Sequence, residues 1–238
     1  MAYKNKFNLN YWLRKFYTSR FFQLLPINKS RLKKRVFTSI YKSNHWVQDD
    51  DILPKENISI SGHGSNTNTE QFYNLEKNLN EVIENYNIKS ILDMPCGDFL
   101  WMKEILKNKK INYLGIDIVE ELIKKNNIKF KTKNIEFENH DIVNFFSERS
   151  FDLIIIRDLF IHIDNSDILR ILNNIKDLDF KYIALNSYEN EINENVIIGK
   201  HRKINLLAHP FNLKKPFYFF KDFEKDKNIF LYKKSDLI

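Results

Sequence analysis

The sequence predicts an α/β protein built on a doubly wound, mostly parallel β-sheet. From residue 89 onward, short apolar runs alternate with amphipathic segments of helical spacing. Continuous apolar strands separated by such helices are typical of parallel sheets that are covered on both faces. The chain closes with two aromatic runs around a charged turn, which predict an antiparallel hairpin at the sheet's end. The expected fold is therefore Rossmann-like, with a C-terminal antiparallel hairpin and additional N-terminal helices.

The elements follow from apolar spacing and from breaking residues. Pro26 should end a first helix, and Ser30 is a candidate cap for the second. Residues 49–69 are expected to be a loop, since they combine proline and glycines with Ser, Asn and Thr. Helices are expected over residues 7–24, 29–46, 68–86, 99–107, 119–126 and 166–177, strands over 89–94, 112–117, 134–141, 151–158 and 180–187, and the hairpin over 216–223 and 228–234.

Composition indicates one globular domain in a reducing compartment. The 238 residues are 43% hydrophobic, which is enough for one substantial core and makes a second full domain improbable. A single cysteine excludes an intramolecular disulfide framework and fits the cytosol. No apolar run reaches the roughly 18 to 20 residues that a membrane span needs, and no signal peptide is evident. We therefore expect a cytoplasmic protein.

Positive charge is concentrated at the N-terminus. The net charge is +7, yet eleven Lys or Arg and no acid precede Asp49, which leaves 27 basic and 31 acidic residues in the remainder. We therefore divide the chain into a basic, aromatic, helical extension at residues 1–48 and a main domain at 49–238. Such asymmetry indicates an anionic partner: a membrane surface, a nucleic acid or a phosphorylated substrate. The helix over 7–24, with Phe7 at its start, either packs on the domain or a second subunit, or lies in a membrane interface.

Polar residues stand where the predicted strands end. Asp93 precedes the turn Met94–Gly97, Asp117 ends the second strand, Asp141 follows the third, and Arg157 and Asp158 end the fourth. Ligands of doubly wound sheets bind at this carboxyl edge, and an acid ending the second strand can hold ribose hydroxyls. The turn contains one glycine and no G-x-G-x-x-G pattern, so a pyrophosphate has no glycine-rich cradle. A nucleoside without a pyrophosphate fits better, which favours S-adenosylmethionine over NAD.

These residues resemble the motifs of class I S-adenosylmethionine-dependent methyltransferases. The stretch DMPCGDFLWM, residues 93–102, is similar to the first motif D-x-P-C-G-D-F-x-W-M of a bacterial subgroup that modifies surface glycans. The resemblance extends from about residue 37 to the C-terminus and leaves residues 1–36 outside it. Further segments that resemble the subgroup are FTSIYKSNHW (37–46), SGHGSNTNTEQ (61–71), YLGIDIVEELIKKN (113–126), HDI (140–142), FDLIIIRDLFIHI (151–163) and HRKINLLAHPFNLKKP (201–216).

The resemblance implies a cofactor site for S-adenosylmethionine. Asp93 and Gly97 would line the methionine part, with Asp98 near its amino or sulfonium end. Asp117 would hold the ribose, and Asp141 with Ile142 would contact adenine. Pro95, Trp101, Ile118 and Arg157 are counted with the same site.

Structural roles remain open for several of these residues. Asp117 and Asp141 could instead cap the helices that follow them, and Asp93 could bond only to the amides of its turn. Trp101 is expected to belong mainly to the core, and Arg157 could pair with an aspartate or bind an anionic substrate. With one cysteine and no ligand spacing typical of zinc, no metal site is expected.

The fourth strand supplies the candidates for catalysis. His162 follows the strand end and could take a hydroxyl proton during methyl transfer, although a core or capping histidine is the plain alternative. Asp158 could be the base, orient the base or bind the acceptor. Candidate substrate-binding residues lie in the glycine loop, residues 61–71, and in the late loop, residues 201–216: His63, His201, Arg202, His209 and Asn212.

The sequence predicts a methyltransferase, and the resemblance to the glycan-modifying subgroup implies O-methylation of a sugar or nucleotide-sugar in capsule or other surface polysaccharide synthesis. Methylation of RNA or of another small molecule is the alternative, as is a SAM-binding subunit without activity. The N-P-P-Y/F motif of base methyltransferases is absent after the fourth strand, where RDLF stands, which argues against a nucleic-acid acceptor. Peripheral association with the inner face of an anionic membrane and a homodimer are further expectations.

Overall fold

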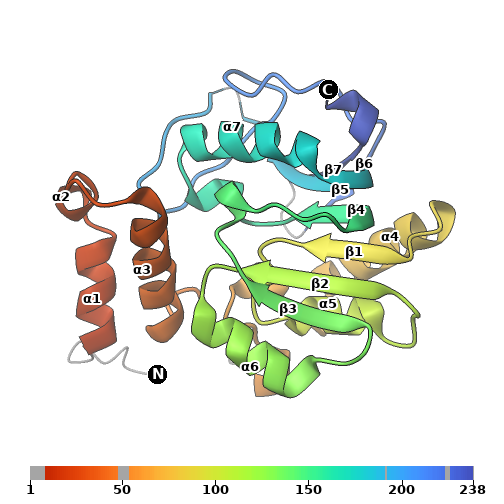
Figure 1. The fold of residues 1–238 in the computed structure, drawn as a ribbon, viewed down its shortest axis with the longest axis horizontal. Helices are drawn as coiled ribbons and strands as arrows, with labels where there is room; N and C mark the ends of the chain where they lie inside the picture. Colours follow the sequence, from red (N-terminus) through yellow and green to blue (C-terminus); the bar gives the residue numbers. More distant parts are fainter. Residues whose placement is uncertain (1–8, 48–53, 191, 223–225, 238) are drawn as a thin grey trace.

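The computed structural model describes residues 9–47, 54–190, 192–222 and 226–237. Its centre is a seven-stranded sheet in the order β3-β2-β1-β4-β5-β7-β6 (Figure 1). The first five strands run parallel, while β7 is antiparallel to both β5 and β6. The predicted Rossmann-like fold with a closing antiparallel hairpin is confirmed. The strands are β1 (Ser90–Asp93), β2 (Asn112–Asp117), β3 (Ile135–Asn139), β4 (Ser150–Ile156), β5 (Asp179–Tyr188), β6 (Tyr218–Lys221) and β7 (Lys227–Lys233).

Two N-terminal details differ from the sequence prediction. The first predicted helix divides into α1 and α2, because the Ser19 side chain accepts the Phe22 N–H and starts a new helix; Phe7 lies outside the described residues. Asn28 rather than Ser30 caps α3, and its side chain accepts the N–H groups of Ser30 and Arg31. The α-helices are α1 (Leu9–Tyr17), α2 (Arg20–Gln23), α3 (Lys29–Lys42), α4 (Glu70–Asn85), α5 (Leu100–Leu106), α6 (Glu120–Phe130) and α7 (Asn165–Asn174).

The central strands are buried on both faces, as their continuous apolar sequences require. Along β4, Leu153 and Ile155 pack into the cluster that contains α4 and α5. Ile154 and Ile156 face the other way and pack into the cluster that contains α3 and α7. Successive side chains of a strand point to opposite faces, so one apolar run serves both layers.

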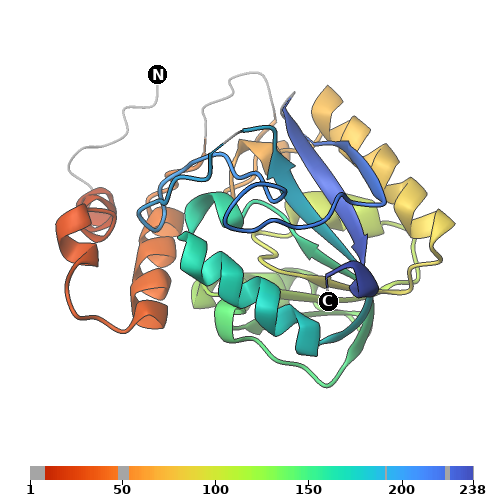
Figure 2. The same ribbon diagram turned by 90° about the horizontal axis from the view of Figure 1, so that it is seen from above.

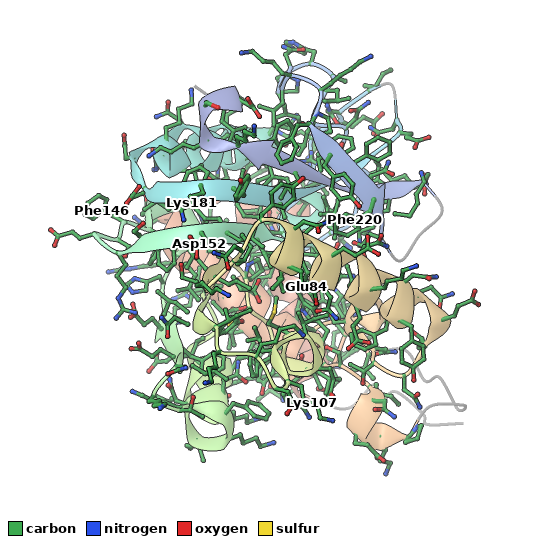
Figure 3. The ribbon with its side chains drawn as sticks, turned by 90° about the vertical axis from the view of Figure 1, so that its right-hand side faces the viewer. Glu84, Lys107, Phe146, Asp152, Lys181 and Phe220 are labelled. Atoms are coloured by element: carbon green, nitrogen blue, oxygen red, sulfur yellow. The ribbon has the colours of Figure 1, made fainter. Side chains whose placement is uncertain are left out.

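The amino ends of the strands are fixed by structural polar contacts. The Asp152 carboxylate on β4 accepts the N–H groups of Lys89 and Ser90, at 2.7 and 3.0 Å, and holds the start of β1. Lys181 of β5 forms an ion pair with the same carboxylate at 2.7 Å (Figure 3). Asp152 therefore joins β1, β4 and β5 at this edge.

Helix α3 is part of the main core. Its Val36 and Ile40 are almost completely buried, in the same cluster as the sheet. In Figures 1 and 2 it stands beside the carboxyl ends of the parallel strands, with α1 and α2 on its outer side. Among the helices of the described ranges, none has both the length and the apolar content that crossing a bilayer requires.

Candidate functional site

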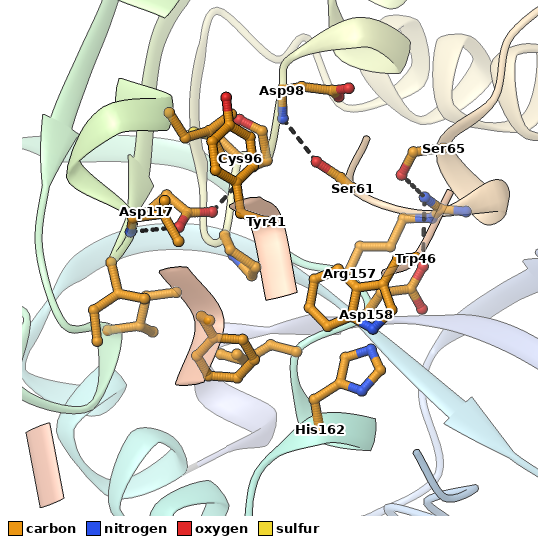
Figure 4. Close-up of a pocket in the computed structure, with 18 of the residues that line it drawn as sticks. Tyr41, Trp46, Ser61, Ser65, Cys96, Asp98, Asp117, Arg157, Asp158 and His162 are labelled. Atoms are coloured by element: carbon orange, nitrogen blue, oxygen red, sulfur yellow. Dashed lines mark hydrogen bonds and ion pairs between the residues drawn. The ribbon is translucent and has the colours of Figure 1, made fainter. Parts of the chain in front are cut away.

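A pocket lies at the carboxyl edge of the sheet, between the strand ends and α3 (Figure 4). It contains about 1010 Å³ of space not filled by protein atoms, part of it open to solvent. That size and a mostly apolar wall with a few polar groups are typical of cofactor and small-molecule sites. Of the predicted cofactor residues, those that line the pocket are Pro95, Gly97, Asp98, Trp101, Asp117, Ile118, Asp141, Ile142 and Arg157.

Asp93 lies beneath the pocket and does not line it. Its side chain is fully buried and accepts the Tyr113 hydroxyl at 2.8 Å, while Oδ1 has no hydrogen-bond partner among the described residues. Burial raises the pKa of Asp93 to about 7. Cys96, in the same turn, is a buried free thiol whose pKa burial raises well above its usual value, so it is a packed side chain.

Asp98 holds the glycine loop and the two residues before it against the turn that follows β1, and Gly97 allows this close approach. The Asp98 carboxylate accepts the Ser59 hydroxyl at 3.0 Å and the Ile60 N–H at 2.8 Å, and its own N–H donates to Ser61 Oγ at 2.9 Å. Gly97 has a positive φ of 55°, and a Cβ there would meet Ser61 Oγ at 2.5 Å. The glycine therefore allows the close approach of the loop, which in turn supplies a wall of the pocket.

Asp117 ends β2 with its carboxylate at the pocket. It accepts the N–H groups of Gly97 at 3.3 Å and Val119 at 2.9 Å, so it stabilises the turn that follows β1. Burial raises its pKa to about 6, against these backbone bonds, which lower it. A carboxylate has about four acceptor positions, so this one keeps capacity for a hydroxyl donor of a ligand.

The part of the pocket next to the ends of β2 and β3 is apolar, with Asp141 at its margin. Ile118 and Ile142 line it, and Asp141 caps the short helix η3 (Ile142–Asn144) by accepting the Val143 N–H at 3.2 Å. The other Asp141 oxygen pairs with Lys33 of α3 at 3.1 Å. Asp141 therefore performs the capping role and also lines the pocket.

Arg157 and Asp158 belong to a buried charge network. Arg157 donates to Asp222 through Nη2 at 2.9 Å and to the Gly64 carbonyl at 2.7 Å, and it lies over the Trp101 ring. Lys227 Nζ joins Asp158 at 2.6 Å and Asp222 at 3.0 Å. Two cations and two anions thus compensate one another. Asp158, with a side chain 29% exposed, is its most accessible member.

This network fixes the charge of Asp158. Burial alone would raise the pKa of Asp158, but the charges of Lys227 and Arg157 hold it below its usual range. The Asn186 side chain accepts the Asp158 N–H at 2.7 Å, where Asp158 has a left-handed φ of 61°. Asp158 is therefore ionised at neutral pH and accepts hydrogen bonds.

His162 stands next to Asp158 at the pocket and stacks on Trp46, with ring centroids 4.7 Å apart (Figure 4). Its Nδ1 lies 2.9 Å from the Lys200 carbonyl oxygen. A carbonyl only accepts, so Nδ1 carries the proton and Nε2 keeps a free lone pair. Burial lowers the pKa of His162 to about 4, and the ring is neutral at physiological pH.

The structure does not bring the predicted substrate residues into the pocket wall. His201 packs edge-on against His162 at 5.9 Å, and Arg202 donates to the Ile163 carbonyl at 2.7 Å. These two residues therefore support the turn that carries His162. His63 begins the short helix η2 (His63–Ser65) without lining the pocket, and His209 and Asn212 are exposed further along the late loop.

Sequence reasoning missed one whole wall of the pocket. Lys33, Phe37 and Tyr41 of α3 line it, together with Trp46 just beyond the helix. Their spacing of four residues places the first three on one helix face, a signal present in the sequence. Asp222, from the end of β6, was also missed.

The residues fit a nucleoside cofactor without a pyrophosphate. Asp117 has acceptor capacity for ribose hydroxyls, and apolar side chains such as Ile118 and Ile142 can enclose a base. Within the described ranges no group of three or more His, Cys, Asp or Glu could hold a metal ion.

Comparison with known proteins identifies the domain. Residues 91–178 match the family model described as a methyltransferase domain, which spans β1 to the end of α7 and beyond. Among curated proteins, the chain is 45% identical over 71 residues to a tRNA (guanine-N(7)-)-methyltransferase of Prochlorococcus marinus strain MIT 9515, and 40% identical over 75 residues to that of strain CCMP1986. These matches cover 28% and 29% of this chain, and the chain spans about a third of the length of either relative, 34% and 35%.

Solved structures share the fold. The N-methyltransferase NodS from Bradyrhizobium japonicum WM9, in complex with S-adenosylhomocysteine, has a TM-score of 0.56 at 13% identity, covering 82% of this chain and 97% of its own. The Burkholderia thailandensis 1,6-didemethyltoxoflavin-N1-methyltransferase, also with S-adenosylhomocysteine, has a TM-score of 0.53 at 12% identity, covering 70% and 79%. The chain therefore has the fold of these methyltransferases, and the family match lies within it.

Proposed function

We propose that this protein is a methyltransferase that uses S-adenosylmethionine to methylate a hydroxyl of a sugar or nucleotide-sugar in surface polysaccharide synthesis. The observation that carries the methyltransferase part is the pocket at the strand ends. Asp117 stands there at the end of β2, and the match to the methyltransferase domain covers the same strands. Both structural neighbours were solved with S-adenosylhomocysteine, the demethylated form of S-adenosylmethionine, which supports this choice of cofactor.

Asp117 would bind the ribose hydroxyls, with Ile118 and Ile142 against the adenine and Asp141 at its exocyclic amine. Gly97 and Trp101 would border the methionine part, while Asp98 would act through the loop that it holds. When bound, the cofactor supplies an electrophilic methyl group on a sulfonium sulfur. The aromatic wall formed by Phe37, Tyr41 and Trp46 would exclude water from that group.

His162 is the general base of this proposal. Its proton is held on Nδ1 by the Lys200 carbonyl, so Nε2 would accept the acceptor's hydroxyl proton while the methyl carbon exchanges its bond to sulfur for one to the acceptor oxygen. Asp158, kept ionised by Lys227, would accept a hydrogen bond from the same or a neighbouring hydroxyl and orient it. Alignment of the two reactants would account for most of the rate enhancement.

The sugar acceptor rests on the resemblance of the first motif, DMPCGDFLWM, to glycan-modifying enzymes. The test is to incubate the protein with labelled S-adenosylmethionine and a panel of nucleotide-sugars and polysaccharide fragments. Methyl transfer to a sugar, abolished in His162→Ala, is the expected result. If an RNA pool accepts label while no sugar does, the sugar assignment fails.

RNA is the second candidate acceptor, because two observations favour it specifically. Two curated relatives are named as tRNA (guanine-N(7)-)-methyltransferases, and the residues before Asp49 are basic and free of acids. The sequence-based expectation against a nucleic acid is therefore not carried forward. Binding to a tRNA pool that falls steeply with salt, together with transfer of label to that pool, would select this alternative.

A further inference from the structure

The short segment of the N-terminal helices carries an unusual number of exposed apolar side chains. Six of the thirteen large hydrophobic residues that are exposed in the described ranges fall within residues 9–25. Phe21 is 74% exposed and Leu24 is 76% exposed. An exposed apolar cluster of this kind marks an interaction surface. The six residues, named here the apolar face, are Leu9, Trp12, Phe16, Phe21, Leu24 and Leu25.

The segment that carries the apolar face is bound to the rest of the domain by specific contacts. Phe22 packs into the main core between the exposed Phe21 and Leu24, and Gln23 exchanges hydrogen bonds with the backbone of Ile198 at 2.9 Å in both directions. The outward side chains are therefore held on an ordered segment. Figures 1 and 2 both place α1 and α2 at the outer end of the molecule, away from the sheet.

A basic groove adjoins the apolar face. It lies between α1 and α3 and contains about 830 Å³ of space not filled by protein, part of it open to solvent. Within the described part of the chain, Arg31 and Arg35 in its wall form no ion pair, whereas Lys34 and Lys42 pair with Glu120 and Glu121 of α6. The residues that line it include no acid: Asn10, Leu13, Tyr17, Arg31, Lys34, Arg35, Thr38, Ser39 and Lys42.

From this juxtaposition we propose that the apolar face and the basic groove together bind the surface of an anionic lipid bilayer. Exposed leucine and phenylalanine side chains would enter the acyl boundary, and Arg31 and Arg35 would contact lipid phosphates. The groove uses a different face of α3 from the one that lines the cofactor pocket, so docking would leave that pocket accessible. This inference does not rest on the proposed methyl transfer.

Other occupants fit the surface less well. RNA would use the arginines and aromatic rings, but exposed Leu9, Leu24 and Leu25 contribute nothing to phosphate binding or base stacking. A symmetric second copy would place the unpaired Arg31 and Arg35 of two grooves against each other, which charge repulsion opposes. A bilayer with negative headgroups satisfies both the charge and the apolar side chains.

The test is co-sedimentation of the full chain with vesicles. One set is phosphatidylcholine alone, and the other is phosphatidylcholine mixed in equal parts with phosphatidylglycerol. The variants are F21S/L24S for the apolar face and R31Q/R35Q for the groove. Their matched controls are I128S, a fully exposed isoleucine on α6, and K131Q/K133Q, two exposed lysines after α6. Circular dichroism melting verifies that each variant is folded.

We expect the wild type to sediment with the anionic vesicles and to be released by high salt, while each surface variant loses at least tenfold in partitioning and the controls are unchanged. Equal binding to neutral vesicles would overturn the role of the groove. Wild-type partitioning of F21S/L24S would overturn the role of the apolar face. No vesicle binding, with tight binding of total RNA that F21S/L24S retains, would assign the surface to RNA instead.

Discussion

Lys33 provides a measurable link between the N-terminal extension and the pocket. Its side chain is 4% exposed, and Nζ lies 3.1 Å from Asp141 and 3.2 Å from Asp167, whose side chain is fully buried. Lys33→Met would remove the charge while keeping most of the side-chain volume. The buried Asp167 carboxylate would then have one cation instead of two, since Lys29 still pairs with it at 3.0 Å.

Removing one partner of a buried ion pair costs about 3–5 kcal/mol, and the remaining lysine should keep the loss near the lower end, about 3 kcal/mol. For a chain of this size, 1 kcal/mol lowers the melting temperature by about 2–4 °C, so we expect a decrease of about 6–12 °C. The assay is thermal unfolding followed by circular dichroism.

Lys34→Met is the matched control on the same helix. Lys34 pairs with Glu120 at 3.0 Å, but both side chains are about half exposed, so the loss should be about 0–1 kcal/mol. Equal melting temperatures for the two variants would refute the claim that the Lys33 ion pairs lock α3 onto the domain.

Three further predictions concern the pocket. His162→Gln should lower kcat by about 10²–10⁴-fold, as expected for loss of a general base, with S-adenosylhomocysteine affinity changed little. Asp222→Asn should lower stability by about 3–5 kcal/mol in urea unfolding, because Arg157 and Lys227 would share the single remaining carboxylate of the network. The affinity for S-adenosylhomocysteine should fall as the pH drops through about 6, the pKa of Asp117, reaching about a tenfold loss one unit below it, since the protonated acid accepts fewer hydrogen bonds.

Each of these has an outcome that contradicts it. Unchanged kcat in His162→Gln would remove it from the reaction, and Asp158→Asn, measured in parallel, would then be the next variant to compare. A stability of Asp222→Asn equal to wild type would show that the network does not need this carboxylate. A pH profile of cofactor affinity that Asp117→Asn leaves unchanged would assign the titration to another group, such as Asp93, whose pKa is about 7.

The pH dependence of folding stability has opposite signs for Asp117 and Asp222. Asp117 has a folded-state pKa raised above its ordinary value, so its contribution is present at low pH and is lost as the pH rises through about 6. Asp222 has a pKa held well below its usual range by Arg157 and Lys227, although burial opposes this. Its stabilisation is therefore present above the ordinary aspartate range and is lost on acidification.

The sheet was predictable because its signal is local. A strand such as β4, with Phe151 and an unbroken Leu153–Ile156 run, is buried on both faces and shows this in its own composition. The strand-end rule then placed Asp117 and Asp158 at one edge, and the structure has both at the pocket.

What the sequence did not provide were contacts between distant segments. The face of α3 formed by Lys33, Phe37 and Tyr41 was visible as a helical pattern, but nothing local says that it packs over the strand ends. Likewise, Asp222 joins Arg157 across 65 residues, and a lone acid after a hairpin strand has no distinguishing pattern.

Residue chemistry also left the role of Asp98 undetermined, for a similar reason. An acid in the first turn could face a ligand or a loop, and the structure has it bound to Ser59 and Ile60. The choice depends on where residues 54–69 pack, which their Gly, Ser and Asn content does not specify.

The most direct test of the account is calorimetric titration of the wild type and Asp117→Ala with S-adenosylhomocysteine. We predict micromolar binding to the wild type and a loss of about 1.5–3 kcal/mol in the variant, the value of hydrogen bonds to a charged group, which is about 10- to 150-fold in affinity. Because Asp117 also accepts the N–H groups of Gly97 and Val119, the variant's ligand-free melting curve must be recorded to separate binding from folding. A wild type that does not bind S-adenosylhomocysteine would contradict the central claim that this pocket is a methyltransferase cofactor site.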